Sequence, residues 1–335
     1  MNLQTAQKLR SSADAVDSTC VLLRGMIDYA GLFSPASLAM ASAVANYGTY
    51  LRSEYNWILG RFILPVARFS EFEKVAEAMN TEATAQSPVE RESRWVLSVL
   101  PGADIPADLA RIQEFNHRFA VSPSPIKAEI KSVEVKIASP EDVERLSKII
   151  PAELETYFEI PLTAREGDCI AAVANCGRRA KIRTGGETAD KFPAPESVVE
   201  FIRFCAAANV PFKATAGLHH PLRSVQRLTY QPESPSGIMH GFLNVFLAAA
   251  FLRAGMEPEL ALQLIKEQSA QAFHFDSEGV IWREHRLLTR DIAAARQGFS
   301  ISFGSCSFTE PIGDLRSLLG RGEAPSPHNL SSHLL

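Results

Sequence analysis

The chain has 335 residues, of which 46% are hydrophobic and 21% are charged, and its formal net charge is −4. This composition excludes intrinsic disorder, which requires low hydrophobicity and high net charge. It also argues against a nucleic-acid-binding protein, because such domains are typically strongly basic. The length suits either two domains or one large barrel.

The cysteines and the apolar stretches indicate the compartment. The five cysteines include no closely spaced pair, which favours reduced thiols over a disulfide framework. The N-terminal sequence MNLQTAQKLRSSADAVDS lacks the apolar core of a secretory signal. The longest apolar stretch, FLNVFLAAAFL, is shorter than the roughly 20 residues that span a bilayer. We therefore expect a soluble cytoplasmic protein that contacts neither membrane nor nucleic acid.

Strand-like runs alternate with helical patterns from residue 20 almost to the end of the chain. Eight strands are predicted, within residues 21–31, 56–68, 94–102, 130–138, 154–162, 178–186, 210–220 and 301–308. Such alternation implies parallel strands joined by helical crossovers, and eight repeats predict an α/β fold of the (β/α)8 TIM-barrel type. A doubly wound open sheet is the alternative, but the sequence MIDYAG stands where its glycine-rich phosphate loop would be.

One unit of the predicted barrel is longer than the others. Residues 221–300 separate the seventh and eighth strands, about twice the length that a β/α unit needs. We predict a long helical insertion there, with helices at 241–255 and 258–270, that lies over the barrel mouth. The barrel is then a single domain over residues 1–320, and residues 321–335 form a flexible C-terminal tail.

Two lysines are predicted to lie side by side in this barrel. Alternation along a strand places Lys181 and Arg183 on one face, and Lys213 and Thr215 on one face of the next strand. Neighbouring strands are about 4.8 Å apart, so the two ammonium groups repel and the pKa of at least one should fall. A neutral lysine is what Schiff-base chemistry requires. The alternative is that both lysines simply extend into solvent from the rim.

Three carboxylates occupy predicted strands. Asp28 ends the first strand, Glu134 lies in the fourth and Glu159 in the fifth. A carboxylate inside a barrel is costly unless it is paired. These three are therefore either acid–base partners of the lysines or members of structural ion pairs with Lys136 or Arg183.

The loops after the last two strands carry polar and small residues. His219 and His220 follow the seventh strand and are predicted to contact a polar substrate or to order the loop. The sequence FGSCS ends the eighth strand and, with Gly217, fits the phosphate site of many barrels, where glycine lets backbone N–H groups approach an anion. No HxH or HExxH spacing is present, so we assign no metal ligand.

Together these segments resemble deoxyribose-phosphate aldolase and its class I, Schiff-base relatives. The matches occur in the family's order: MIDYAGLFSPAS, GRFILPVAR, AKIRTGG, PFKATAGL and FGSCS. They cover about residues 21–220 and 300–320, and their order and spacing carry the resemblance.

The resemblance implies roles for individual residues. Lys181 would be the Schiff-base nucleophile, Lys213 the cation that lowers its pKa, and Asp28 part of a proton relay. Glu134 lies nearest to the family's fourth-strand aspartate and is a longer acid. The residues implied to bind a substrate phosphate are Gly217, Gly304 and Ser305.

The rim departs from the family pattern. Arg183 replaces a small residue beside the nucleophile and would suit a carboxylate or a second phosphate on the substrate. Thr215, His219, His220 and the long insertion also remodel the rim.

The sequence thus predicts a cofactor-free carbon–carbon lyase of the aldolase type that acts on a small carbonyl compound, either phosphorylated or carboxylated. One alternative is a metal-dependent barrel hydrolase or isomerase that uses His219 or His220 with Asp28 or Glu159. Another is a non-catalytic barrel whose residues 221–300 form a binding or oligomer surface. A homo-oligomer is compatible with every one of these hypotheses.

Overall fold

Eight parallel strands close into a barrel in the computed structural model, which describes residues 18–86, 93–122 and 126–319. The predicted TIM barrel is therefore confirmed, and the open-sheet alternative is wrong. The order around the barrel is β1-β13-β7-β6-β5-β4-β3-β2. The barrel strands are β1 (Ile27–Tyr29), β2 (Leu59–Pro65), β3 (Ser93–Leu100), β4 (Ile126–Lys136), β5 (Glu155–Glu159), β6 (Arg179–Arg183), β7 (Phe212–Thr215) and β13 (Ser300–Ser305).

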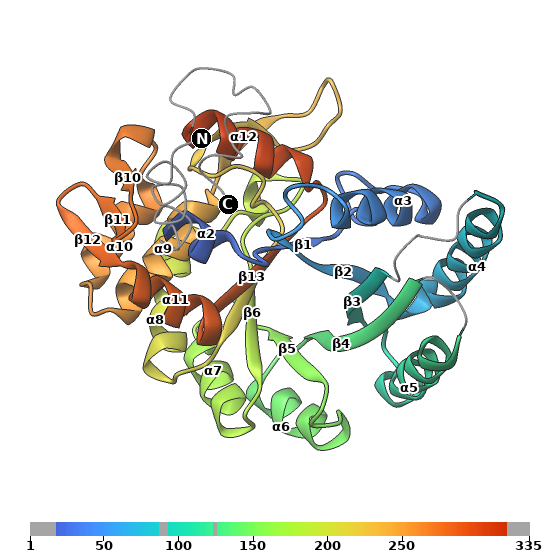
Figure 1. Ribbon diagram of the computed structural model, residues 1–335. Coiled ribbons are helices and arrows are strands. Elements are labelled where there is room, and N and C mark those ends of the chain that lie inside the picture. Colours follow the sequence, from blue (N-terminus) through green and yellow to red (C-terminus); the bar gives the residue numbers. More distant parts are fainter. Residues whose placement is uncertain (1–17, 87–92, 123–125, 320–335) are drawn as a thin grey trace, which may run out of the picture.

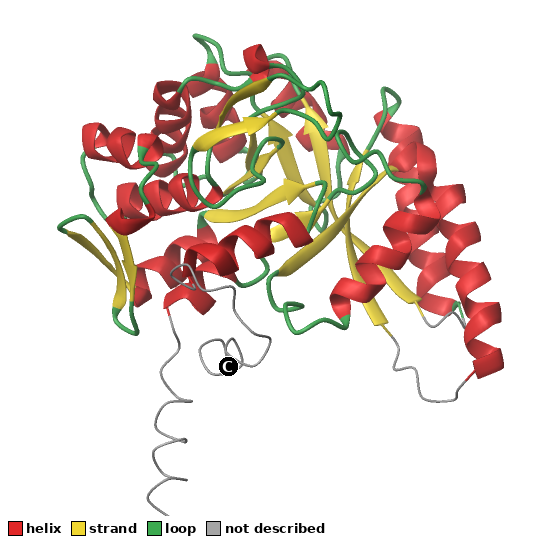
Figure 2. Cartoon of the chain, turned by 90° about the horizontal axis from the view of Figure 1, so that it is seen from above, coloured by secondary structure: helices red, strands yellow, loops and turns green. Residues whose placement is uncertain are grey.

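Helices surround the strands (Figure 1, Figure 2). They are α2 (Ser18–Leu23), α3 (Met40–Leu51), α4 (Phe69–Gln86), α5 (Ile105–Val121), α6 (Pro140–Ile149), α7 (Glu166–Asn175), α8 (Pro195–Ala207), α9 (Phe242–Arg253), α10 (Pro258–Lys266), α11 (Thr289–Gly298) and α12 (Thr309–Leu319). Three short 3-10 turns are η1 (Val66–Arg68), η2 (Ala189–Lys191) and η3 (Ala270–Ala272). Proline begins α6, α8 and α10, where its fixed φ suits the first helical turn and its missing N–H costs nothing.

The first predicted strand is shorter than expected. Residues 21–23 belong to α2 rather than to a strand, and β1 begins only at Ile27. A short apolar run such as VLL fits a buried helix as well as a strand, so periodicity cannot separate them. In the structure Leu22 and Leu23 are buried, and α2 packs against α11.

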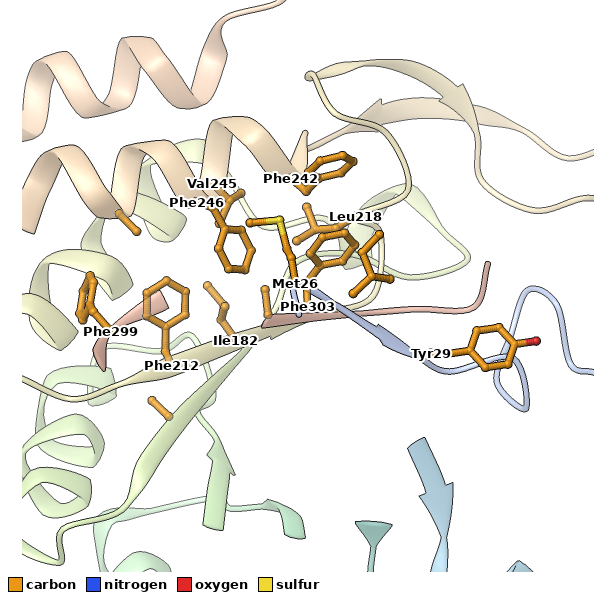
Figure 3. Close-up of a cluster of buried hydrophobic side chains, with 14 of the residues drawn as sticks. Met26, Tyr29, Ile182, Phe212, Leu218, Phe242, Val245, Phe246, Phe299 and Phe303 are labelled. Atoms are coloured by element: carbon orange, nitrogen blue, oxygen red, sulfur yellow. The ribbon is translucent and has the colours of Figure 1, made fainter. Parts of the chain in front are cut away.

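The main apolar core lies between the strands and the helical ring. Figure 3 shows Phe212 and Phe303 on their strands below Phe242 and Phe246 of α9. The rings of Phe242 and Phe303 stack at 5.1 Å between centroids, and those of Phe212 and Phe246 lie 6.4 Å apart. Such contacts stabilise the barrel from outside, because outward-facing strand residues alternate with those that face the barrel interior.

Helix α9 is buried around most of its surface because it is enclosed by α8, α10, α11 and β13. Its one buried polar side chain, Asn244, has hydrogen-bond partners for both its oxygen and its nitrogen. The Asn244 Oδ1 accepts from the Arg223 amide at 2.8 Å, and Nδ2 donates to the carbonyls of Leu264 and Glu267 at 2.7 and 2.9 Å. These bonds tie α9 to α10 and satisfy a buried amide that would otherwise be costly.

Residues 221–300 contain strands as well as helices, which corrects the prediction of a helical segment. Helices α9 and α10 lie where helices were predicted. The segment also contains the hairpin β8 (Ser224–Arg227) and β9 (Ser236–Met239), and the antiparallel sheet of β10 (Phe273–Phe275), β11 (Gly279–Trp282) and β12 (His285–Leu288). Strands of three or four residues are too short for an alternating pattern to reveal them.

The parts of this segment lie in different places. The β10–β12 sheet contacts α11, and its Asp276 and Gly279 carbonyls accept hydrogen bonds from the Ser18 hydroxyl at the start of α2. Leu228 and Met239, at the ends of the β8–β9 hairpin, instead line the cavity described below. The predicted tail at 321–335 lies outside the described residues. Among the described helices, none combines the length and the apolar character needed to cross a bilayer.

Candidate active site

The inward-facing side chains of the barrel form a charged layer near the carboxyl ends of the strands. Lys181 of β6 lies directly opposite Lys213 of β7 in the strand register, as the sequence spacing predicts. Glu159 of β5 is the register partner of Lys181 on the other side. Three ionisable side chains on consecutive strands therefore lie at one height inside the barrel.

Lys213 is enclosed by carboxylates. Its Nζ lies 2.6 Å from Asp28 Oδ2 and 2.6 Å from Glu134 Oε1, and its side chain is 2% exposed. Burial alone would lower the pKa of Lys213, but the two adjacent carboxylates outweigh burial and raise that pKa above its ordinary value. Lys213 therefore stays a cation. Repulsion between the two lysines does not lower the pKa of Lys213, because Asp28 and Glu134 compensate its charge.

Lys181 contacts a second pair of carboxylates. Its Nζ lies 2.9 Å from Glu134 Oε2 and 2.9 Å from Glu159 Oε2. Glu134 thus bridges the two lysines, and the Ser98 hydroxyl donates to its Oε1 at 2.8 Å. Burial would raise the pKa of Glu134, but Lys181 and Lys213 outweigh it and hold that pKa well below its usual range. Glu134 is therefore a permanent anion between two ammonium groups.

Asp28 is held in place from three directions. Besides Lys213, its carboxylate accepts hydrogen bonds from the Ser302 hydroxyl at 2.7 Å and from the Arg61 amide at 2.7 Å. A β-carbon on Gly60 would lie 2.3 Å from Asp28 Oδ1, so only glycine at position 60 leaves room for this carboxylate. Asp28 is consequently rigid and lies behind Lys213.

Glu159 differs from Glu134 in its access to solvent. The side chain of Glu159 is 14% exposed and that of Glu134 only 3%. Glu159 is therefore the more accessible of the two carboxylates that contact Lys181. The sequence is compatible with an acid–base role for Glu159 and with a structural ion pair with Arg183, whose Nε lies 3.9 Å from Glu159 Oε1. Its register opposite Lys181 is the signal that favours the acid–base role.

A cavity of about 760 Å³ opens above this charged layer. Its lining contains most of the predicted site residues: Glu134, Lys181, Arg183, Lys213, Thr215, Gly217, His219 and Gly304. Asp28, His220 and Ser305 are not part of the lining. The carboxyl ends of the strands, where the cavity opens, are where TIM-barrel enzymes carry their active sites.

The loops after β6 and β7 touch at two glycines. Gly217 has a φ of +74°, and a β-carbon there would lie 2.8 Å from the Phe192 ring and 2.9 Å from the Gly185 Cα. A side chain at this position would therefore force the two loops apart. Ser305, predicted to face a phosphate, is buried, and its hydroxyl accepts from the Ser307 amide at 3.3 Å.

Both predicted rim histidines contact α12. His219 Nδ1 lies 3.0 Å from Glu310 Oε2, and His220 Nδ1 lies 2.5 Å from Asp314 Oδ2. Glu310 and Asp314 are four residues apart and so lie on one face of the helix. The metal hypothesis instead required a histidine beside Asp28 or Glu159. Nowhere in residues 18–86, 93–122 and 126–319 do three or more His, Cys, Asp or Glu side chains form a group that could hold a metal ion.

Comparisons of the chain with protein-family models, with curated proteins and with solved structures find no match. The chemistry of the site therefore follows from its own side chains. They provide two lysines of unlike surroundings, a buried bridging anion and an accessible carboxylate beside Lys181.

Proposed function

We propose that the protein is a cofactor-free, class I aldolase-type carbon–carbon lyase in which Lys181 forms the Schiff base. The observation that carries the proposal is the contact of Lys181 Nζ with the accessible carboxylate of Glu159 in the floor of the cavity. Lys213 is less suited to attack a carbonyl, because two buried carboxylates at 2.6 Å keep it protonated.

The reaction begins when Lys181 loses a proton to Glu159. The free amine attacks the substrate carbonyl carbon and gives a carbinolamine, which takes up a proton and loses water to leave an iminium ion. The substrate also carries a hydroxyl group on the carbon β to the iminium. Removal of the proton from this hydroxyl group then breaks the bond between the α- and β-carbons. The bonding electrons pass into the iminium, so an enamine remains on Lys181 and an aldehyde leaves. Protonation of the enamine carbon and addition of water release the second product and restore Lys181.

The remaining charged groups act by electrostatic stabilisation, by positioning and by proton transfer, and none of them forms a covalent adduct with the substrate. Glu134 lies 2.9 Å from Lys181 and stabilises the positive charge of the iminium. Lys213 holds Glu134 in that orientation, and Asp28 holds Lys213. Glu159 carries protons between the cavity and the reacting atoms, since it lines the cavity, contacts Lys181 and is more exposed than Glu134.

Borohydride trapping tests the proposal. The protein is incubated with small aldehydes, ketones and sugar phosphates, reduced, and digested for peptide mass spectrometry. We expect a reduced adduct on Lys181 that is lost in Lys181→Ala and kept in Lys148→Ala, a matched change of an exposed lysine on α6. An adduct on Lys213 would reverse the roles of the two lysines. Absence of any adduct on folded protein would refute Schiff-base chemistry.

We also propose that residues 221–300 elaborate the seventh β/α unit and that their β8–β9 hairpin covers part of the mouth. Leu228 and Met239 in the cavity lining support this role. The five cysteines are all free thiols, which suits the proposed cytoplasmic location. The homo-oligomer stays a prediction.

A further inference from the structure

The cavity is positively charged although the whole chain is acidic. Its lining contains five cations and three carboxylates, whereas the chain has a net charge of −4. Asp28 offsets Lys213, and Asp190 offsets Lys191, since Asp190 Oδ2 lies 3.2 Å from Lys191 Nζ. The positive charge of the lining is therefore concentrated at Lys136 and Arg183. A cleft lined by one sign of charge concentrates ligands of the opposite sign. The lining therefore favours an anionic ligand.

Three of these cations have no role in the proposed Schiff-base chemistry. Lys136 ends β4, Arg183 ends β6, and Lys191 ends the η2 turn that follows β6. Arg183 lies two residues beyond Lys181 on the same face, so its backbone is about 6–7 Å closer to the mouth. The Lys191 stem lies against Gly186, where a β-carbon would be 2.7 Å from the Lys191 Cβ. The three cations thus belong to the β4–β6 side of the mouth. Arg183 is nearer to the mouth than Lys181, and Lys136 is at the register level of Glu159 and Lys181.

The other walls of the cavity are unsuited to an anion. Phe33 follows β1, Ile63 lies on β2 and Leu100 ends β3, so the wall on this side is apolar. Strand β2 is four places from β6 in the ring of eight and therefore faces it across the barrel. On the β7–β13 side, His219 is held by the carboxylate of Glu310. His219 therefore already has an anionic partner.

We propose that the substrate is an amphipathic oxo acid whose carboxylate is bound at the β4–β6 side by Arg183, assisted by Lys136 and Lys191. Its apolar part contacts the wall of Phe33, Ile63 and Leu100 across the cavity. The guanidinium group matches a carboxylate with two parallel hydrogen bonds, a geometry that lysine cannot supply. The position of the carbonyl rests on the proposed function, whereas the carboxylate site rests on Arg183, Lys136 and Lys191 in the cavity lining.

Titration calorimetry with ligands that cannot form a Schiff base tests the carboxylate site. The probes are 3-phenylpropanoate and its uncharged isostere 3-phenylpropanamide. We expect the carboxylate to bind at least about tenfold more tightly than the amide, since a hydrogen bond to a charged group contributes that much. Arg183→Gln and Lys136→Gln should abolish this preference. Lys148→Gln, a matched change on the outside of the barrel, should keep it. Circular dichroism checks that each variant is folded.

Equal affinity for the two probes would overturn the inference, and so would a carboxylate preference that survives in the double variant Arg183→Gln/Lys136→Gln. If phenyl phosphate binds more tightly than 3-phenylpropanoate and this binding depends on Arg183, the site recognises a phosphate and the proposed carboxylate is wrong. Acetate should bind more weakly than 3-phenylpropanoate, and equal binding would refute the apolar contact.

Trapping with 4-phenyl-2-oxobutanoate separates this inference from the proposed function. A calorimetric carboxylate preference without a trapped adduct would retain the anion site and refute Schiff-base chemistry with this oxo acid. An adduct on Lys181 without any carboxylate preference would retain the chemistry and refute the anion site.

Discussion

Replacing Lys213 by methionine tests the buried charge network directly. The change removes the one cation that lies 2.6 Å from both Asp28 and Glu134, and Met preserves most of the side-chain volume. Asp28 then loses its ammonium partner, while Glu134 keeps Lys181. Removing one partner of a buried ion pair costs about 3–5 kcal/mol, because the remaining charge is left without compensation.

The size of the effect on thermal stability follows from chain length. Unfolding has an entropy of about 2 cal/mol/K per residue, or about 0.7 kcal/mol/K for 335 residues. A loss of 3–5 kcal/mol therefore lowers the Tm by about 4–7 °C at pH 7. Differential scanning calorimetry measures this shift. The matched variant Lys148→Met, on the exposed face of α6, should leave the Tm unchanged.

The stability of the native protein should also depend on pH in a direction set by these pKa shifts. In the native protein the raised pKa of Lys213 contributes stability that is complete below the unfolded pKa of about 10.4 and is lost as pH rises through the folded pKa. The lowered pKa of Glu134 contributes stability that is present above about pH 4.3 and is lost as pH falls further. The Lys213→Met defect should shrink as the pH falls below about 4.3, because the share of the lowered Glu134 pKa that depends on Lys213 then ceases to stabilise the native protein.

Two results would refute this reasoning. One is a Tm loss of less than about 1 °C at pH 7, which would mean that water or other groups already solvate the carboxylates. The other is a loss that does not shrink at low pH or in the double variant Lys213→Met/Asp28→Asn. In that double variant the charge left by Lys213 is also removed.

The remaining predictions concern Glu159 and the close contact of Gly217 with Phe192. Glu159→Gln should slow carbon–carbon cleavage by about 10²–10⁴-fold in single-turnover assays, because it removes the proton carrier beside Lys181. Glu155→Gln, on the same strand but outside the cavity lining, should keep the rate, and equal losses in the two variants would contradict the assigned role. Gly217→Ala should cost about 1–3 kcal/mol, since its φ is +74° and its β-carbon would meet Phe192. Gly298→Ala is the control in thermal denaturation, because a β-carbon at Gly298 has open space around it. If Gly217→Ala lowers stability no more than Gly298→Ala does, the close contact of Gly217 with Phe192 and Gly185 is refuted.

The periodicity of the sequence predicted a helix or strand correctly where the residues of that element themselves determine its conformation. Alternation of strand-like and helical runs predicted the eight-stranded barrel, and period-two spacing placed Lys181 opposite Lys213. It failed at residues 21–23, where a short apolar run belongs to α2, and in residues 221–300, where strands of three or four residues were missed. The conformation of these short segments depends on the elements against which they are buried, and the periodicity of so few residues does not reveal it.

The sequence by itself determined the barrel and the height of its lysines, because strand periodicity is a property of neighbouring residues. The tertiary structure alone decided which carboxylate meets which lysine. Asp28 and Lys213 are 185 residues apart and meet only because the barrel closes between β1, β13 and β7. Closure also raises the pKa of Lys213, since carboxylates from other strands at 2.6 Å outweigh both burial and repulsion from Lys181.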